Sequence, residues 1–222
     1  MYFKDRTQAG QLLAERLKQY AGKEVVVYAI PRGGIIIGAE IVKSLSVPLD
    51  LVIVKKISHP RNPEYAIAAA AANGHTINAC ELALIDDNWL EEEIERQRQE
   101  AARRREKYLR GNSTMSPEGK IAIVVDDGAA TGLTLRVAIK EIKHSNPLRL
   151  IVAVPIIPKS TAEIIRKDAD KLVTLEMPSD GEFFGSVGSY YENFAQVNDK
   201  DVIKIFDAYR DQSHQPVRKV AI

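Results

Sequence analysis

Short apolar runs recur along the chain, and segments with helical periodicity separate them. Residues 25–30 (VVVYAI) form one such run, rich in β-branched side chains and ended by the turn-forming sequence Pro-Arg-Gly-Gly. Apolar runs without polar alternation are typical of strands that are buried on both faces of a parallel sheet. We therefore predict strands at residues 25–30, 49–54, 83–85, 121–125, 150–155 and 171–175.

The intervening segments carry apolar residues three and four positions apart, which predicts helices. Residues 5–20 place Leu13 and Leu17 at this spacing, and Asp5 or Thr7 can cap the first turn. We predict further helices at residues 34–45, 133–143, 161–167 and 199–210. The alternation favours one α/β domain over residues 1–222: a doubly wound, mainly parallel sheet with helices on both faces.

Three segments depart from this alternation. Residues 57–72 begin with prolines and charges and become rich in alanine, which predicts a loop leading into a strand of small residues. Residues 88–110 predict a charged helical insertion, in which Arg103-Arg104-Arg105 is either a solvated face or a contact for RNA. Residues 178–198 gather aromatic side chains in a chain that is only 6% aromatic, and they form a candidate hood over a ligand site.

Composition narrows the class of protein. Of the 222 residues, 45% are hydrophobic and 27% are charged, which excludes global disorder. Thirty-one basic and 30 acidic residues argue against a general nucleic-acid binder, so we expect no DNA partner. The single cysteine, Cys80, excludes an internal disulfide framework and a cysteine-based zinc cluster. The polar N-terminus and the short apolar runs predict a cytoplasmic protein without membrane contact.

The strongest chemical pattern lies at residues 121–134, where an apolar strand precedes Asp126, Asp127 and the sequence GAATGLT. Backbone N–H groups at such a turn, together with the hydroxyls of Thr131 and Thr134, can bind a phosphate dianion. Carboxylates at the carboxyl edge of a sheet can accept hydrogen bonds from the vicinal hydroxyls of a sugar. The alternative is an ordinary strand–turn–helix junction in which Asp127 caps the helix.

This pattern resembles the signature of the type I phosphoribosyltransferases: four apolar residues, two acids, a small-residue turn and Thr-Gly-x-Thr. The resemblance implies that Asp126 and Asp127 hold the ribose 2- and 3-hydroxyls of phosphoribosyl pyrophosphate (PRPP). Gly128 stands where many members carry an aliphatic residue. The residues that the resemblance assigns to the 5-phosphate are Gly128, Ala129, Ala130, Thr131, Gly132 and Thr134.

Two upstream segments are similar to the same family. Arg32-Gly33-Gly34, by itself a tight turn, resembles the loop that binds pyrophosphate. Residues 51–59 (LVIVKKISH) resemble the strand that enters the catalytic loop. Lys55 and Lys56 would neutralise pyrophosphate there as the C1–O bond breaks, unless the loop is simply solvated and basic. Further candidates near this loop are His59, Arg61 and Glu64.

The C-terminal part resembles a bacterial phosphoribosyltransferase group whose acceptor is not assigned, and the similar residues are 188–202. In type I members a variable hood covers the acceptor base. Tyr190 or Tyr191 could supply its stacking wall, as could Phe183 or Phe184, although aromatic side chains of this kind also serve as core.

The resemblance implies that a nitrogen nucleophile of a purine, pyrimidine or related ring displaces pyrophosphate from PRPP, as in nucleotide salvage. It also implies Mg²⁺ as cofactor, held through PRPP and not by a cluster of protein side chains. We expect PRPP and a small-molecule acceptor as ligands, and a homodimer as the assembly. The alternatives are a PRPP-sensing regulator without turnover, which could bind RNA, and a salvage-type enzyme whose acceptor is not a nucleobase.

Overall fold

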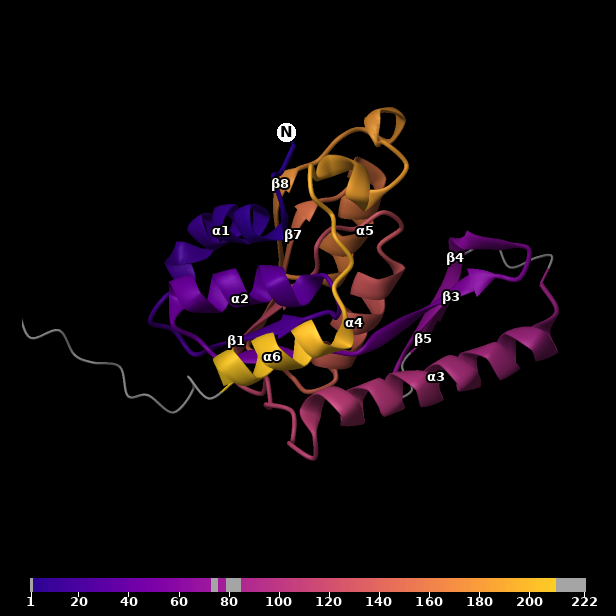
Figure 1. Cartoon of the computed structure of the whole chain (residues 1–222), viewed down its shortest axis with the longest axis horizontal. Helices are drawn as coiled ribbons and strands as arrows, with labels where there is room; N and C mark the ends of the chain where they lie inside the picture. The colour runs from indigo at the N-terminus through magenta and orange to yellow at the C-terminus, as the bar shows by residue number, and fades with distance from the viewer. Residues whose placement is uncertain (1, 73–75, 79–84, 211–222) are drawn as a thin grey trace, which may run out of the picture.

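The computed structural model describes residues 2–72, 76–78 and 85–210, whose main feature is a sheet of five parallel strands (Figure 1). The strand order is β2-β1-β6-β7-β8, so the chain begins near the middle of the sheet and moves outward in both directions. The strands are β1 (Val25–Ala29), β2 (Leu49–Leu51), β6 (Ile121–Val125), β7 (Arg149–Ile156) and β8 (Lys171–Glu176).

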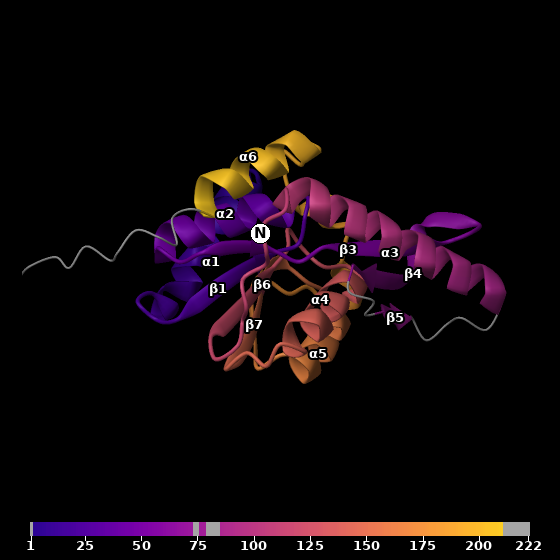
Figure 2. The same cartoon turned by 90° about the horizontal axis from the view of Figure 1, so that it is seen from below.

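Helices cover both faces of this sheet (Figures 1 and 2). Val25 and Val27 of β1 join the apolar core on one face, while Val26 and Tyr28 join the core on the other. This two-sided burial explains why the strands are continuous apolar runs, and it confirms the predicted doubly wound α/β fold. The first face is covered by α1 (Arg6–Leu17), α2 (Gly34–Leu45) and α6 (Asp199–Arg210), and the second by α4 (Leu133–Lys143) and α5 (Lys159–Asp168).

A second sheet projects away from the first, with a long helix along it (Figures 1 and 2). Its antiparallel strands lie in the order β3-β4-β5, and Ile57, Ile67 and Leu90 form a small separate core between sheet and helix. The helix occupies the segment predicted as a charged insertion. The elements are β3 (Val54–His59), β4 (Asn62–Ala71), β5 (Thr76–Asn78) and α3 (Asp87–Leu109).

Two predictions differ from this arrangement. The single strand predicted at 49–54 is divided between β2 and β3, which belong to different sheets. The loop predicted at the start of 57–72 is instead part of the β3–β4 hairpin, whose strands pair up to His59 and Asn62, so the prolines and charges there mark a tight turn and not a longer loop. The predicted strand of small residues lies within β4. The strand predicted at 83–85 falls on residues of which only Ile85, in a bend, is described.

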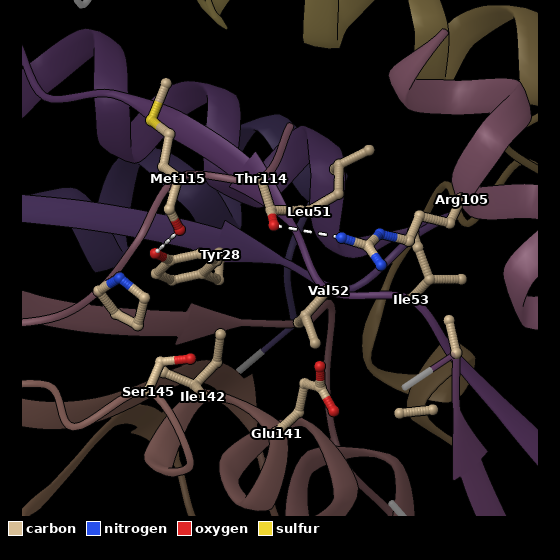
Figure 3. A pocket seen from close by; sticks show the side chains of 13 residues that line it. Tyr28, Leu51, Val52, Ile53, Arg105, Thr114, Met115, Glu141, Ile142 and Ser145 are labelled. Atoms are coloured by element: carbon tan, nitrogen blue, oxygen red, sulfur yellow. Dashed lines mark hydrogen bonds between the residues drawn. The ribbon is translucent and has the colours of Figure 1, made fainter. Parts of the chain in front are cut away.

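The segment that joins α3 to β6 is attached to the main sheet by partly buried hydrogen bonds (Figure 3). The Tyr28 hydroxyl donates to the Met115 carbonyl at 2.7 Å, and the Met115 N–H donates to the buried Asp50 carboxylate of β2. Arg105 of α3 donates to the Thr114 hydroxyl at 3.2 Å. These contacts surround a cavity of about 90 Å³ and fix where the projecting sheet joins the domain.

Residues 178–198, the hood segment, follow β8 and lie above β7 and β8 in Figure 1. Two short 3₁₀ turns, Asp180–Glu182 and Val187–Tyr190, shape it, and a third, Lys18–Tyr20, follows α1. Backbone hydrogen bonds tie the hood segment to the N-terminus, since the Phe3 N–H donates to the Tyr190 carbonyl and the Glu192 N–H to the Phe3 carbonyl, both at 2.8 Å. Within the described ranges, no helix combines the length and apolar character that a membrane span requires.

Candidate functional site

The turn after β6 is held in shape by neighbouring elements. Asp126 and Asp127 directly follow the strand, and Gly132, with φ of 71°, precedes the first residue of α4. The Ala129 N–H donates to the carbonyl of Ile156 at the end of β7, at 2.9 Å. The Thr161 hydroxyl of α5 donates to the Ala130 carbonyl at 2.6 Å. Sequence reasoning missed this support by Thr161.

The predicted phosphate-binding turn, both acids and Lys56 line one cleft of about 460 Å³. The hood segment closes its opposite side, and Arg6 of α1 completes it. Arg32 and Gly33 line an adjoining cleft of about 350 Å³, which Arg6 and Phe194 also border. The residues that line the larger cleft are Arg6, Lys56, Asp126, Asp127, Gly128, Ala129, Ala130, Thr131, Gly132, Thr134, Leu135, Gly185, Ser186, Val187, Gly188 and Phe194.

One polar atom in this cleft lacks a partner. The Thr134 hydroxyl oxygen is buried and has no hydrogen-bond partner among the described residues, whereas Thr131 is exposed. A buried hydroxyl without a partner costs free energy, so a ligand oxygen or a water molecule at this position would stabilise the first turn of α4. A helix N-terminus also favours an anion through its free N–H groups and its dipole.

The two acids differ in their surroundings. The Asp126 carboxylate accepts a hydrogen bond from the Asp127 N–H at 2.8 Å, while the Asp127 carboxylate pairs with Arg6 Nε at 2.7 Å. Burial and the negative charge of Asp127 raise the pKa of Asp126 well above its ordinary value, and the positive charge of Lys56 acts against this. Hydroxyl donors or a cation at this edge would therefore stabilise the ionised pair.

The donor set suits a cation that the substrate also coordinates. No group of three or more His, Cys, Asp or Glu side chains that could hold a metal occurs within the described parts of the chain. Two adjacent carboxylates are hard oxygen donors of the type that Mg²⁺ accepts alongside phosphate oxygens and water. Asp126 and Asp127 would hold such an ion.

The predicted pyrophosphate loop packs closely against Asp127 at Gly33. A Cβ atom at this position would lie 1.8 Å from Asp127 Oδ2 and 3.0 Å from Arg6 Nε. Any side chain here would displace the carboxylate, so glycine is required by the approach of the loop. Gly34, next in the chain, begins α2.

The departure from the family signature at Gly128 also has a steric cause. Its φ is 155°, and an added Cβ would lie 2.5 Å from Val187 Cγ1 and 2.7 Å from Ile156 Cγ2. An aliphatic side chain at this position would therefore collide with the hood segment. Glycine allows Val187 to approach the turn directly.

The two lysines of β3 lie in different surroundings. Lys56 lines the larger cleft, whereas burial and the positive charge of Arg104 lower the pKa of Lys55, which lies near α3. Further along the hairpin, the Arg61 N–H donates to His59 Nδ1 at 3.1 Å, and neither residue lines the clefts described above. The Glu64 side chain lies outside the described residues.

The aromatic side chain that lines the cleft is Phe194. Tyr190 and Tyr191 are buried within the hood segment, where the Tyr191 hydroxyl donates to the Asp127 carbonyl at 2.6 Å. Tyr190 packs against Phe183 with a centroid separation of 5.6 Å. The stacking candidates named from the sequence were Phe183, Phe184, Tyr190 and Tyr191, and none of them lines this cleft. Sequence reasoning missed Phe194, because only the tertiary fold determines which ring reaches the cleft.

The basic cluster of α3 is engaged within the protein. Arg103 and Arg104 both pair with Glu100, at 2.7 and 2.9 Å, and Arg105 contacts Thr114. The Arg103 side chain is nevertheless 63% exposed, so these contacts leave the cluster at the surface of α3.

Comparison with known proteins agrees with the fold. A family model for the phosphoribosyl transferase domain matches residues 6–192. The chain belongs to this family, which confirms the resemblance inferred from the acid pair and the turn.

Two relatives show how far the similarity extends. Proteins of Mycobacterium tuberculosis strains H37Rv and CDC 1551, provisionally named phosphoribosyl transferases, are 36% identical over 213 residues. The match covers 94% of this chain and 47% of each relative, so the chain spans about half the length of these curated relatives. The crystal structure of TT1426 from Thermus thermophilus is 35% identical, with a TM-score of 0.77, and the match covers 94% of this chain and 99% of that one.

Proposed function

We propose that this chain binds PRPP in the larger cleft and transfers its phosphoribosyl group to a ring nitrogen of a nucleobase or related compound, releasing pyrophosphate. The observation that carries the proposal is a single cleft lined by two carboxylates, the turn that begins α4 and the cationic side chain of Lys56. The buried Thr134 hydroxyl without a partner among the described residues gives this turn a hydrogen-bonding position for a phosphate oxygen.

Each part of the cleft has a distinct role in this proposal. The N–H groups of the turn and the hydroxyls of Thr131 and Thr134 bind the 5-phosphate at the N-terminus of α4. Asp126 and Asp127 accept hydrogen bonds from the ribose hydroxyls and orient C1 toward the hood segment. Phe194 offers a ring face for stacking of a planar acceptor.

The pyrophosphate end lies in the adjoining cleft, beside Arg32-Gly33. When bound with the substrate, Mg²⁺ supplies positive charge that withdraws electrons from the leaving group. Lys56 places its ammonium charge where negative charge develops on the departing pyrophosphate. Family resemblance further supports a cytoplasmic role in nucleotide salvage. It also supports a homodimer, and light scattering would test this assembly by its mass.

The decisive experiment measures PRPP binding by calorimetry with Mg²⁺ present, then pyrophosphate release with a panel of nucleobases. Replacing both Asp126 and Asp127 by Asn keeps the side-chain size but removes the charge, so PRPP binding should weaken by about 2–4 kcal/mol. Asp168→Asn, which removes an acid of a partly exposed ion pair on α5, is the matched control and should bind normally.

Unchanged affinity in a folded double variant would contradict the assignment of the acids. Tight PRPP binding by the wild type without pyrophosphate release for any acceptor would instead favour a sensor of PRPP over a transferase.

A further inference from the structure

Arg6 is a buried cation at the junction of three elements. Only 8% of the residue is exposed, and its Nε donates to Asp127 Oδ2 at 2.7 Å. Its Nη1 donates to the Ala195 carbonyl of the hood segment at 2.8 Å. The guanidinium carbon lies 3.7 Å from the centroid of the Phe194 ring. One side chain thus contacts a proposed ribose-binding acid, the hood backbone and the aromatic wall.

Backbone hydrogen bonds between residues 3–4 and the hood segment explain how Arg6, Asp127 and the hood segment come together. The Phe3 N–H binds the Tyr190 carbonyl, and the Asn193 N–H donates to the Lys4 carbonyl at 2.9 Å, so the chain enters α1 alongside the hood segment. Arg6 consequently borders both clefts. Movement of the hood segment relative to Asp127 would have to break or stretch the contacts of Arg6.

This position is unfavourable for an arginine on local grounds. Arg6 is the first residue of α1, where the helix dipole disfavours a cation, and the first turn holds no acidic residue. Removing a guanidinium from water also costs free energy unless a charged partner and hydrogen bonds compensate. The contacts to Asp127 and Ala195 supply that compensation, so the reason for the arginine lies in the cleft and not in the helix.

We propose that Arg6 is a positioning residue for PRPP and its acceptor: it orients the Asp127 carboxylate and fixes the hood segment relative to it. This inference rests on the proposed function of the cleft. The Arg6 side chain contacts Ala195 and Phe194, so it fixes the position of the ring on which the acceptor would stack. The same side chain orients Asp127, the acid proposed to bind the ribose. Binding of the ribose and placement of the acceptor are therefore coupled through Arg6.

The test compares Arg6→Gln and Arg6→Lys, with calorimetry against PRPP, ribose 5-phosphate and pyrophosphate. Arg6→Gln should weaken PRPP and ribose 5-phosphate about 10- to 100-fold, the effect of losing a hydrogen bond between charged groups, and leave pyrophosphate within about twofold. Arg6→Lys retains the charge beside Asp127 and should recover part of the affinity. Arg136→Gln, which breaks the partly exposed pair with Asp168, is the matched control and should bind like wild type.

A double-mutant cycle separates positioning from general damage to the fold. Arg6→Gln combined with Asp127→Asn removes both charges of the Arg6–Asp127 pair, so it provides a folded reference if Arg6→Gln alone unfolds. When Asp127 is already Asn, the further change at Arg6 should alter ribose 5-phosphate affinity less than about threefold, because the group that Arg6 positions has lost its charge.

Additive losses in the cycle, or unchanged PRPP affinity in Arg6→Gln, would overturn the positioning role. A loss confined to pyrophosphate would also overturn it, since Arg6 would then be a ligand of the leaving group. Failure of the wild type to bind PRPP would refute the proposed function and this inference together, whereas normal wild-type binding confines any failure to Arg6.

Discussion

Individual side chains in the cleft differ in their surroundings, and the two threonines of the turn illustrate this. The Thr134 hydroxyl is buried and has no hydrogen-bond partner among the described residues, whereas Thr131 is exposed at the surface of the turn. A ligand phosphate would complete the hydrogen bonding of Thr134. In the free protein that hydroxyl lowers stability.

We expect Thr134→Val to weaken ribose 5-phosphate binding about tenfold, the loss of one hydrogen bond to a charged group. The midpoint temperature of thermal unfolding of the ligand-free variant should be unchanged or higher than that of the wild type, because an unsatisfied buried hydroxyl is removed. Thr131→Val should weaken PRPP more than pyrophosphate if its hydroxyl also meets the 5-phosphate. Calorimetry and thermal melts check these outcomes, and a Thr134→Val variant with lower stability and normal affinity would contradict the assignment.

The lysines of β3 provide an internal comparison, since Lys56 borders the cleft and Lys55 lies near α3. If Lys56 meets charge that develops on the leaving pyrophosphate, Lys56→Met should lower the single-turnover rate more than PRPP affinity. Lys55→Met serves as the matched control and should affect the rate less. The rates are measured once an acceptor is found. If both variants then react at the wild-type rate, neither lysine takes part in the chemistry.

Packing between elements determines how the hood segment reaches the site. Gly128 has a φ of 155°, and its missing Cβ leaves room for Val187 and Ile156. The turn after β6, the end of β7 and the hood segment therefore meet at one glycine. Val187 and Ile156 occupy the space that an aliphatic side chain at position 128 would need.

Gly128→Ala should displace the hood segment and destabilise the protein by about 1–3 kcal/mol, through the contact with Val187 and the unfavourable φ. Adding Val187→Ala should restore part of the stability, because it removes the atoms nearest to the new Cβ. Urea unfolding of the four proteins of this cycle measures the coupling. Independent effects of the two substitutions would exclude the proposed contact.

For the molecule as a whole, Asp50 links the main sheet to the segment that carries the chain back from the projecting sheet. This buried carboxylate accepts hydrogen bonds from the Leu51 and Met115 N–H groups. Burial nevertheless raises the pKa of Asp50 to about 6, and the positive charges of Arg210 and Arg105 limit the increase. The ionised form is thus less favourable in the folded protein than in the unfolded chain.

The sign of the resulting pH dependence follows from this raised pKa. The contribution of Asp50 to stability is fully present below the unfolded value of 3.8 and is lost as pH rises through about 6. The free energy of unfolding of the wild type, minus that of Asp50→Asn, should fall by up to about 3 kcal/mol between pH 4 and 7. Urea titrations across this range check it, and a difference that is constant with pH would contradict the assignment.

Local patterns in the chain were enough to predict most elements of the main sheet and the core of the site. Apolar runs predicted the buried strands β1, β6 and β7 and the edge strand β8, and the signature after β6 located the cleft-lining acids Asp126 and Asp127 and the turn that follows them. These features depend on residues that are adjacent along the chain, so a short window contains their full signal.

Contacts between distant segments decided the rest. The pairing of Arg6 with Asp127 spans 121 positions, and the choice of Phe194 as the cleft aromatic depends on how the N-terminus holds the hood segment. The sequence predicted the alanine-rich strand of β4 but not its pairing with β3, because the prolines and charges between them indicated a loop. The sequence by itself thus determined most of the sheet and the position of the turn after β6, whereas tertiary packing alone decided which remote side chains complete the cleft.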